Sequence, residues 1–429
     1  MQKISFKDKN YKKALTPLFE RSAYPPEIEA DVKKILDNIQ KKGNSAVAKF
    51  AKKFDKVVLT PARFKVSKRE INDAVAKVAP AKKRAINAAV KNVSAYASKQ
   101  LPKGWSFSPR PGVKVGERFE PLDRVGVYIP GGTAPLVSTI VHTAAIAKTA
   151  GVKEIVAITP PGPKGKLLPE LIYAMQRSGI TEIYRLGGVY GIAALAYGTE
   201  TIPKVEKIVG PGNAYVTAAK KLVYGEVAID MVAGPSEIMI IADKTCNPAH
   251  IAADLLSQAE HGSGHEQAVL LSTSKKIIDG VERELLNQAS FLTRSDTVYN
   301  VIEKGIFLIQ VRNIDEAANI ANKYAPEHLE IMCEKAQRVS KKIKAAGALF
   351  IGKWTPEAAG DFVAGPSHVL PTGGTAKYFS GLTADQFFRR MSIVNYTQKA
   401  LQREAVNIAK FAEMEGLDAH GNSAAIRLK

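Results

Sequence analysis

The sequence has very little cysteine. Its 429 residues include only Cys246 and Cys333, which lie far apart in the chain. A disulfide framework needs cysteines in pairs with suitable spacing, and a Cys-x-x-Cys metal site needs two neighbouring thiols. Both are therefore excluded, and a reducing compartment is expected.

Apolar runs long enough to cross a membrane are also lacking. The most apolar stretch, residues 128–159, is interrupted by His142, Lys148 and Gly151, whereas a spanning helix needs about 20 consecutive apolar residues. The first residues contain no apolar core of a secretory signal, and the acidic residues among them argue against a transit peptide. We expect a cytoplasmic protein with no membrane partner.

Acidic residues are too few to balance the basic ones. Lys and Arg total 61 against 41 Asp and Glu, a net charge of +20, which raises the alternative of a nucleic-acid-binding protein with salt-sensitive affinity. In the Lys-rich first hundred residues, however, lysines alternate with apolar positions such as Val32, Leu36 and Ile39, as on a solvated helix face. Neither helix-turn-helix nor zinc-finger spacing accompanies them. The pattern favours a solvated basic surface, and no nucleic acid partner is expected.

A repeated strand, turn and helix pattern begins at Arg124. Short apolar runs end in Gly or Pro turns and are followed by helical spacing, first in residues 125–236 and again from Glu237. Parallel strands need such crossovers, so the pattern predicts an α/β fold with two incomplete Rossmann-like, doubly wound domains. The two ends of the chain read as helical and charged. We predict helical N- and C-terminal arms, which could pack on a second copy of the chain.

Three glycine turns end predicted strands within residues 125–236. They are Pro130-Gly131-Gly132, Gly187-Gly188 and Gly210-Pro211-Gly212-Asn213. In doubly wound sheets a ligand binds beyond the carboxyl ends of the strands, where helix N-termini offer N–H groups to phosphates. The turns therefore suggest a dinucleotide site. None has the spacing GxGxxG, and tight turns between strand and helix would explain them equally well.

Histidine is scarce, and most of it falls in four short polar segments. Of the seven histidines, His142 lies in an apolar helical pattern and is predicted to be packed, and His250 begins a helix. The other five lie in or beside Ser257-Gln-Ala-Glu-His261, Tyr324-Ala-Pro-Glu-His328, Asp361-Phe-Val-Ala-Gly-Pro-Ser-His368 and Glu415-Gly-Leu-Asp-Ala-His420. Each segment combines histidine with a carboxylate or an amide, the groups used for divalent metals and for proton transfer near neutral pH.

Spacing within two of these segments suggests separate tasks. Gln258 and His261 are three residues apart, so they would share one face of a helix. Glu327 and His328 are adjacent, so their side chains should diverge and could serve two proton-transfer roles in one pocket. No HExxH spacing identifies a metal site by itself.

With these segments, the chain resembles the histidinol dehydrogenase family nearly end to end. The motifs that carry the resemblance are Arg124-Val-Gly-Val-Tyr-Ile-Pro-Gly-Gly132, Gly210-Pro-Gly-Asn213, Ala233-Gly-Pro-Ser-Glu237, Asp254-Leu-Leu-Ser-Gln-Ala-Glu-His261, Tyr324-Ala-Pro-Glu-His-Leu-Glu330 and His368-Val-Leu-Pro-Thr372. The resemblance implies a zinc-dependent homodimer that oxidises L-histidinol to L-histidine through L-histidinal, with two NAD+. Relatives that oxidise other primary alcohols, such as sulfonated diols, leave an alternative substrate open.

The resemblance also implies roles for particular residues. The implied zinc ligands are Gln258, His261, Asp361 and, from the C-terminal arm of the partner subunit, His420. His328 resembles the general base that takes the alcohol proton, and Glu327 resembles the residue that activates water on the aldehyde. The implied substrate contacts are Ser236, Gln258, His261, His328, Asp361, His368, Glu415 and His420. The implied NAD contacts are Tyr128, Tyr190 and Asn213.

Two positions depart from the family pattern. Tyr190 stands where the family commonly has Gln, and its ring could stack on the cofactor or bond to it. His261 is followed by Gly262-Ser-Gly-His265 where an acidic residue is usual. The glycines take His265 off the helix face, so we expect it at the surface or behind the ligands.

The predicted domains divide the chain into four parts. Residues 1–24 are predicted to form the N-terminal helical arm, and residues 380–429 the C-terminal one. Residues 25–124 together with 237–379 are predicted to form a first α/β domain with most of the metal and catalytic site. Residues 125–236 are predicted to form the NAD-binding domain.

Overall fold

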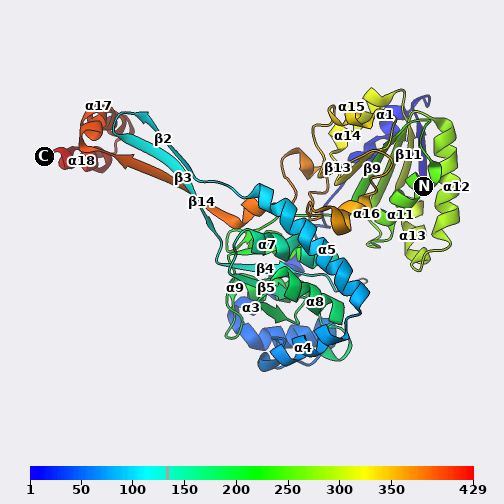
Figure 1. Cartoon of the computed structure of the whole chain (residues 1–429), viewed down its shortest axis with the longest axis horizontal. Helices are drawn as coiled ribbons and strands as arrows, with labels where there is room; N and C mark the ends of the chain where they lie inside the picture. The colour runs from blue at the N-terminus through cyan, green and yellow to red at the C-terminus, as the bar shows by residue number, and fades with distance from the viewer. Residues whose placement is uncertain (132–134) are drawn as a thin grey trace.

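A computed structural model describes residues 1–131 and 135–429 and shows two α/β bodies with a projecting arm (Figure 1). Gly132, the last residue of the first predicted glycine turn, lies outside the described residues. Each body contains a wholly parallel sheet with helices on both faces, which confirms the predicted α/β class. No helix within the described part of the chain is both long and apolar enough to cross a membrane.

The first body is built on a six-stranded parallel sheet, sheet A. Ile238 and Ile240 of its central strand pack against helices on one face, and Met239 and Ile241 against helices on the other. Because both faces are covered, the strand is apolar at successive positions, as parallel sheets require. In spatial order the strands are β1 (Gln2–Ser5), β11 (Ile306–Gln310), β10 (Gln267–Ser272), β9 (Glu237–Ala242), β12 (His328–Ile331) and β13 (Ala348–Ile351). The helices are α11 (Pro248–Ala259), α12 (Lys275–Ala289) and α13 (Ser295–Lys304) on one face, and α1 (Tyr11–Ala14), α2 (Thr16–Phe19), α14 (Ile314–Tyr324) and α15 (Ala336–Ser340) on the other.

The second body is built on a five-stranded parallel sheet, sheet B. In spatial order its strands are β6 (Glu182–Tyr184), β5 (Glu154–Ile158), β4 (Arg124–Tyr128), β7 (Lys207–Val209) and β8 (Ala228–Ile229). The helices α3 (Ile28–Phe50), α9 (Gly188–Tyr197) and α10 (Ala214–Val223) cover one face. The other face is covered by α5 (Pro80–Ala97), α6 (Val137–Ile140), the π-helical turn η4 (Val141–Ala145), α7 (Ile146–Thr149) and α8 (Pro169–Ser178), with α4 (Lys68–Lys77) beside them.

The order of sheet B creates a crevice between β4 and β7, because the chain leaves these neighbours in opposite directions. At its mouth Gly210 has a φ of +114°, and a Cβ there would lie 2.2 Å from the carbonyl oxygen of Tyr128. Only glycine fits between the two strand ends. The sequence motif Gly210-Pro-Gly-Asn213 therefore shapes the predicted dinucleotide edge.

The arm is a long antiparallel ribbon that carries two helices away from both bodies (Figure 1). Its strands, in spatial order, are β14 (Phe388–Tyr396), β3 (Val113–Pro121) and β2 (Trp105–Arg110). The Thr397 side chain caps α17 (Gln398–Glu415), Gly416 ends that helix in a left-handed conformation, and α18 (Asp418–Ala425) follows. Residues 380–429, predicted to form a helical arm, do contain the helices α17 and α18. They also contain β14, which was not predicted and pairs with the distant strand β3.

The structure also corrects two other domain boundaries. Residues 1–24 do not form a helical arm, because β1 pairs in parallel with β11 at the edge of sheet A and α1 and α2 pack on that sheet. Within residues 25–124, helices α3 to α5 pack on sheet B and not on sheet A as predicted, since the apolar stripe of α3 is buried against α9 and α10. Of these helices, α5 also contacts η6 (Gly360–Ala364), where the Asn92 amide donates to the Val363 carbonyl at 2.8 Å. Short elements complete the fold: the π-helical turn η1 (Ala51–Asp55), α16 (Glu357–Ala359), the π-helical turn η6 (Gly360–Ala364), and 3-10 turns at Pro61–Arg63, Ser98–Gln100, Pro163–Gly165, Thr375–Lys377, Ala384–Phe387 and Ile426–Leu428.

Candidate active site

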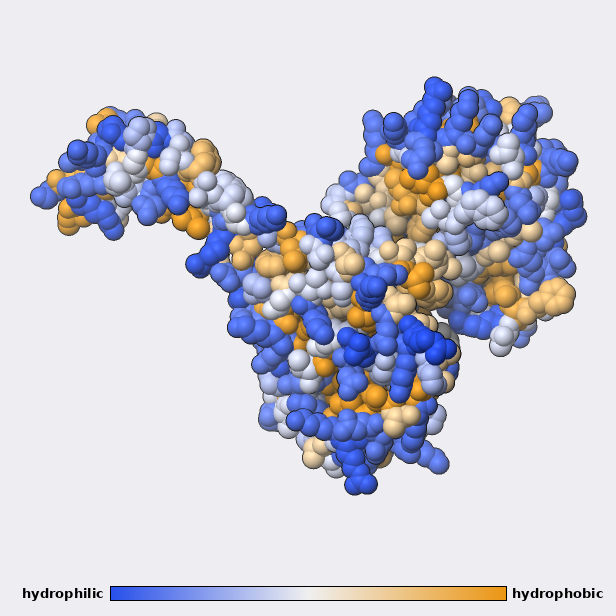
Figure 2. Space-filling model, viewed as in Figure 1, coloured by the Kyte–Doolittle hydropathy of each residue, from blue (hydrophilic) through white to orange (hydrophobic). Residues whose placement is uncertain are grey.

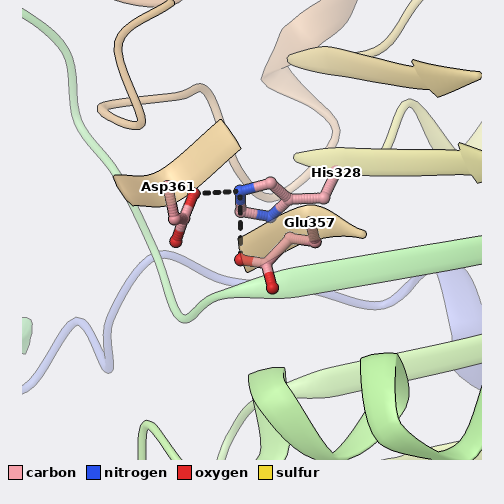
Figure 3. Close-up of side chains that lie close together, drawn as sticks. All are labelled: His328, Glu357 and Asp361. Atoms are coloured by element: carbon pink, nitrogen blue, oxygen red, sulfur yellow. Dashed lines mark ion pairs between the residues drawn. The ribbon is translucent and has the colours of Figure 1, made fainter. Parts of the chain in front are cut away.

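A buried histidine and two carboxylates form the centre of the site (Figure 3). The Nε2 atom of His328 lies 3.3 Å from Oδ1 of Asp361 and 3.8 Å from Oε1 of Glu357. His328 begins β12, Glu357 begins α16, and Asp361 lies in η6, which directly follows α16. The spacing of four residues between Glu357 and Asp361 places both carboxylates on the same side of one helical turn. One ligand atom from each of the three residues could hold a metal ion.

The backbone of Glu237 orients both members of the Glu327-His328 pair. Its N–H donates to Oε2 of Glu327 at 2.9 Å, and its carbonyl oxygen accepts from Nδ1 of His328 at 3.0 Å. Because a carbonyl can only accept, the proton of a neutral His328 sits on Nδ1, and Nε2 is left as the proton acceptor. The prediction that the two side chains diverge is wrong, since Oε2 of Glu327 lies 3.6 Å from Nδ1 of His328.

Burial dominates the protonation of the glutamates. It raises the pKa of Glu327 to about 8 and the pKa of Glu357 to about 7. Burial also opposes ionisation of Asp361, but the hydrogen bond and charge of His328 hold the pKa of Asp361 below its usual range. Burial disfavours the charged imidazole, yet the surrounding carboxylates raise the pKa of His328. The site therefore combines an ionised Asp361 with carboxyl groups that can gain or lose a proton near neutral pH.

Gln258 is a buried amide beside this cluster. Its residue is wholly buried, and no residue in the described part of the chain bonds to either its Oε1 or its Nε2. The neighbouring Ser257 donates to Oε2 of Glu357 at 2.7 Å, which fixes the end of α11 against the carboxylates. His261 lies just beyond the end of α11, where its N–H donates to the Gln258 carbonyl at 3.2 Å, so a tight turn extends the helix from Gln258 to His261. An amide buried without a partner is costly unless a ligand satisfies it.

The cluster lies at the amino edge of sheet A, because Glu237 and His328 are the first residues of β9 and β12. Ligands of doubly wound sheets usually bind at the opposite, carboxyl edge. A cavity of about 450 Å³ opens beside Asp361 and is also lined by His368. The Thr139 hydroxyl of α6, a helix of the second body, lies 3.4 Å from Nε2 of His368. The site therefore sits where the amino edge of sheet A meets the second body.

The predicted NAD contacts lie at the carboxyl edge of sheet B. Tyr128 ends β4, and its phenol oxygen accepts from the Gly188 N–H at 3.4 Å. Asn213 caps α10 by accepting from the Val216 N–H at 3.1 Å, which leaves its amide N–H groups for another partner. Tyr190 is buried in α9, and its hydroxyl donates to Oδ2 of Asp55.

The remaining predicted site residues lie beside the cluster or at the surface. Ser236 directly precedes Glu237, so it lies beside the cluster and is partly exposed. His265 is exposed. Glu415 and His420 are exposed on the projecting arm, which carries them away from the cluster formed by their own chain (Figure 1).

Comparison with known proteins shows the family of the chain. Residues 20–428 match the family model described as histidinol dehydrogenase. The chain is 45% identical over 403 residues to a histidinol dehydrogenase of Listeria monocytogenes, covering 94% of this chain and 93% of that protein. It is 41% identical to one of Geobacter sulfurreducens, with 100% of each covered. The chain belongs to the histidinol dehydrogenase family. The crystal structure of the histidinol dehydrogenase from Elizabethkingia anophelis superposes with a TM-score of 0.93 at 36% identity, covering 100% of this chain and 98% of that one.

Sequence reasoning missed Glu357 and the backbone role of Glu237 in this member of the histidinol dehydrogenase family. Glu357 carries no neighbouring histidine, so the search for histidine segments passed over it. Its position four residues before Asp361 was the available signal. The contribution of Glu237 comes from main-chain atoms, which no side-chain pattern reveals.

Proposed function

We propose that this chain oxidises L-histidinol to L-histidine by way of L-histidinal, and that each of two NAD+ molecules accepts one hydride. Membership of the histidinol dehydrogenase family over residues 20–428 supports the reaction. The observation that carries the proposal is that Oε2 of Glu327 and Oδ1 of Asp361 lie 3.6 Å and 3.3 Å from the two ring nitrogens of His328, and that Asp361 lines a cavity next to the second body.

His328 is the proposed general base for the alcohol. With Nδ1 bonded to the Glu237 carbonyl, Nε2 is the nitrogen that exchanges protons, and in neutral His328 it would take the hydroxyl proton while a hydride leaves the adjacent carbon. The carboxylates that raise the pKa of His328, Asp361 among them, favour the imidazolium that results. Glu327 is the proposed activator of water. Its buried carboxyl is held by the Glu237 N–H, and its carboxylate form can take a proton from the water that adds to L-histidinal.

The proposed zinc ligands are Gln258, His261 and Asp361, with His420 of the partner subunit as the fourth. The unpartnered Oε1 of Gln258 supports this set, because its burial is explained by a ligand that the side chain would meet. A bound zinc ion would hold the amine and imidazole of L-histidinol and polarise the reacting oxygen. The further proposed substrate contacts are Ser236, His368 and, from the partner arm, Glu415.

The proposed NAD contacts are Tyr128, Tyr190 and Asn213. Tyr128 and Asn213 flank the crevice between β4 and β7, where Gly210 lets the two strand ends approach closely and the N-terminus of α10 could bind a phosphate. The phenol of Tyr190 already has a partner in Asp55 and its side chain is buried in α9, so a contact of Tyr190 with NAD would have to be made without that hydroxyl.

A homodimer would explain why the arm projects away from the site of its own chain. Large apolar side chains on the arm are exposed, which is unusual for a surface that faces only water (Figure 2). They include Val406 at 68%, Phe411 at 63% and Met414 at 71% exposure. We propose that the arm packs on a second copy and brings Glu415 and His420 to its site.

The decisive test is the amount of NADH formed per L-histidinol in metal-free and zinc-loaded protein. Two NADH per L-histidinol, lost with a chelator and restored by Zn²⁺, are expected. One NADH would show that oxidation stops at the aldehyde, and activity that survives chelation would remove the metal from the proposal. Sulfopropanediol, assayed in parallel, should not be turned over; turnover comparable to that of L-histidinol would contradict the substrate assignment.

A further inference from the structure

His142 is a buried histidine that the proposed mechanism does not use. It lies in the π-helical turn η4 of the second body and has no exposed surface. Its contacts are polar and involve the segment 366–368, which begins just beyond the Asp361 turn. π-helical turns are rare and occur frequently at functional sites.

His142 contacts three consecutive residues of that segment. Its Nδ1–H donates to the Pro366 carbonyl at 3.0 Å, and its own carbonyl accepts from the Ser367 hydroxyl at 2.9 Å. Its ring stacks on that of His368, with centroids 4.5 Å apart and an angle of 19° between the planes. The Ser367 hydroxyl in turn accepts from the Val369 N–H at 3.1 Å, which closes the turn around His368.

The orientation of His368 is thus set from the second body. Besides the stacking on His142, the Thr139 hydroxyl reaches Nε2 of His368 at 3.4 Å, and Thr139 lies three residues before His142. The same imidazole lines the cavity beside Asp361. Because the two rings stack, the His142 ring limits how the imidazole of His368 can turn within the cavity.

A role in packing alone does not account for this residue. The Nε2 atom of His142 is buried and has no hydrogen-bond partner among residues 1–131 and 135–429. An apolar ring of similar shape would remove that unsatisfied atom, but it would leave the Pro366 carbonyl without its donor. What only histidine provides here is a flat ring for stacking combined with an Nδ1–H donor on the same side chain.

We propose that His142 is a positioning residue for His368, which it fixes in the plane needed to contact the substrate. The inference rests on the proposed function in one respect, namely that His368 contacts L-histidinol. His142 itself touches neither substrate nor reacting atoms. Through this contact, the body with the dinucleotide crevice determines how the other body presents its imidazole.

Two variants separate the two properties of the side chain. His142→Phe keeps a ring for stacking and removes the donor, and His142→Asn keeps a donor in the place of Nδ1 and removes the ring. Each should raise the KM for L-histidinol about tenfold and leave the KM for NAD+ unchanged, because a misplaced group weakens only the contact that it makes. His250→Phe and His250→Asn, at an exposed histidine, are the matched controls.

A double-mutant comparison identifies the route of the effect. If His142 acts through His368, His142→Phe should change the KM little further in a His368→Ala background, whereas additive effects would overturn the proposal. Unchanged KM values for L-histidinol in both His142 variants would also overturn the proposal.

A measurement without substrate separates this proposal from the proposed function. In protein carrying isotope-labelled histidine, the ring resonances of His368 should shift in both His142 variants and stay in place in both His250 variants. Unshifted resonances would overturn the positioning role. Absence of L-histidinol oxidation by the unaltered protein would instead contradict the proposed function.

Discussion

At the residue scale, the adjacent pair Glu327 and His328 should divide the reaction. His328→Asn keeps a donor for the Glu237 carbonyl but removes Nε2, so both oxidation steps should slow by about 10²-fold to 10⁴-fold. Glu327→Gln keeps the bond from the Glu237 N–H but removes the base for water, so it should slow mainly the oxidation of L-histidinal. Single-turnover NADH formation from L-histidinol and from L-histidinal measures each step. Equal losses in both steps for Glu327→Gln would contradict this division.

Gln258 gives a second prediction at this scale, because metal binding and folding should respond in opposite ways. Gln258→Leu removes the proposed ligand and also two buried polar atoms that lack partners in the described chain. The metal-free protein should keep or slightly increase its free energy of unfolding. Its Kd for Zn²⁺, measured by chelator competition, should rise about tenfold or more.

The matched control for Gln258 is Gln288 of α12. Its Nε2 donates to the Ala249 carbonyl at 3.0 Å, so Gln288→Leu should destabilise the protein by about 1 kcal/mol and leave zinc affinity unchanged. If Gln258→Leu instead destabilises the metal-free protein and binds zinc normally, Gln258 is a structural residue.

At the scale of elements, Arg124 connects the amino ends of three strands of sheet B. It begins β4 and pairs with Glu154, the first residue of β5, and with Glu182, the first residue of β6, at 3.0 Å. Partial burial opposes ionisation of Glu182, but the Arg124 guanidinium and the Tyr184 hydroxyl lower the pKa of Glu182 from 4.5 to about 2. A carboxyl with a depressed pKa stabilises the fold above its unfolded pKa and loses that contribution as the pH falls toward the folded value.

Glu182→Gln should therefore destabilise the protein at pH 7 and become neutral near pH 2. We expect about 2 kcal/mol at pH 7, less than the roughly 3 kcal/mol of the full shift because solvent screens part of the pair. Urea unfolding at pH 7, 4 and 3 measures the difference. Glu154→Gln is the control, since that side chain is 56% exposed and should cost less than about 1 kcal/mol. A Glu182 effect that is independent of pH would contradict the ion-pair account.

The elements also show what the sequence can predict. β9 and β5 were predicted because strands buried on both faces are apolar at nearly every position, and a turn follows each. β1 was not predicted, since only Ile4 of its four residues is buried and its partner β11 lies about 300 residues away. The burial of His142 was predicted from its apolar neighbours, but its contacts with residues 366–368 depend on how the two bodies meet. Local patterns therefore predicted the strands that are buried on both faces, but they did not predict β1 or β14, whose pairing partners lie far away in the chain.

At the scale of the whole molecule, the arm leaves each chain with an incomplete set of predicted residues. Gln258, His261, Asp361 and His368 belong to the bodies, whereas Glu415 and His420 are exposed on the projecting arm (Figure 1). The three-stranded ribbon of the arm holds α17 away from both bodies, and its apolar side chains Val406, Phe411 and Met414 are exposed, so the proposed dimer would cover them. If residues of two subunits form each site, mixing subunits that carry different substitutions can test it.

Mixing subunits that carry His328→Asn with subunits that carry His420→Asn should restore activity. If the arm of one subunit completes the site of the other, each hybrid dimer contains one site with both residues intact and one site that lacks both. Random association makes half of the dimers hybrids, so about a quarter of the unaltered activity is expected after co-refolding or co-expression. If each arm served its own chain, every site in every hybrid would lack one residue, and no activity would return. Two controls make the restored activity specific to the exchange of arms. Each parental variant should be inactive alone, and a mixture of His328→Asn with Glu327→Gln should not complement, because both residues belong to the same body.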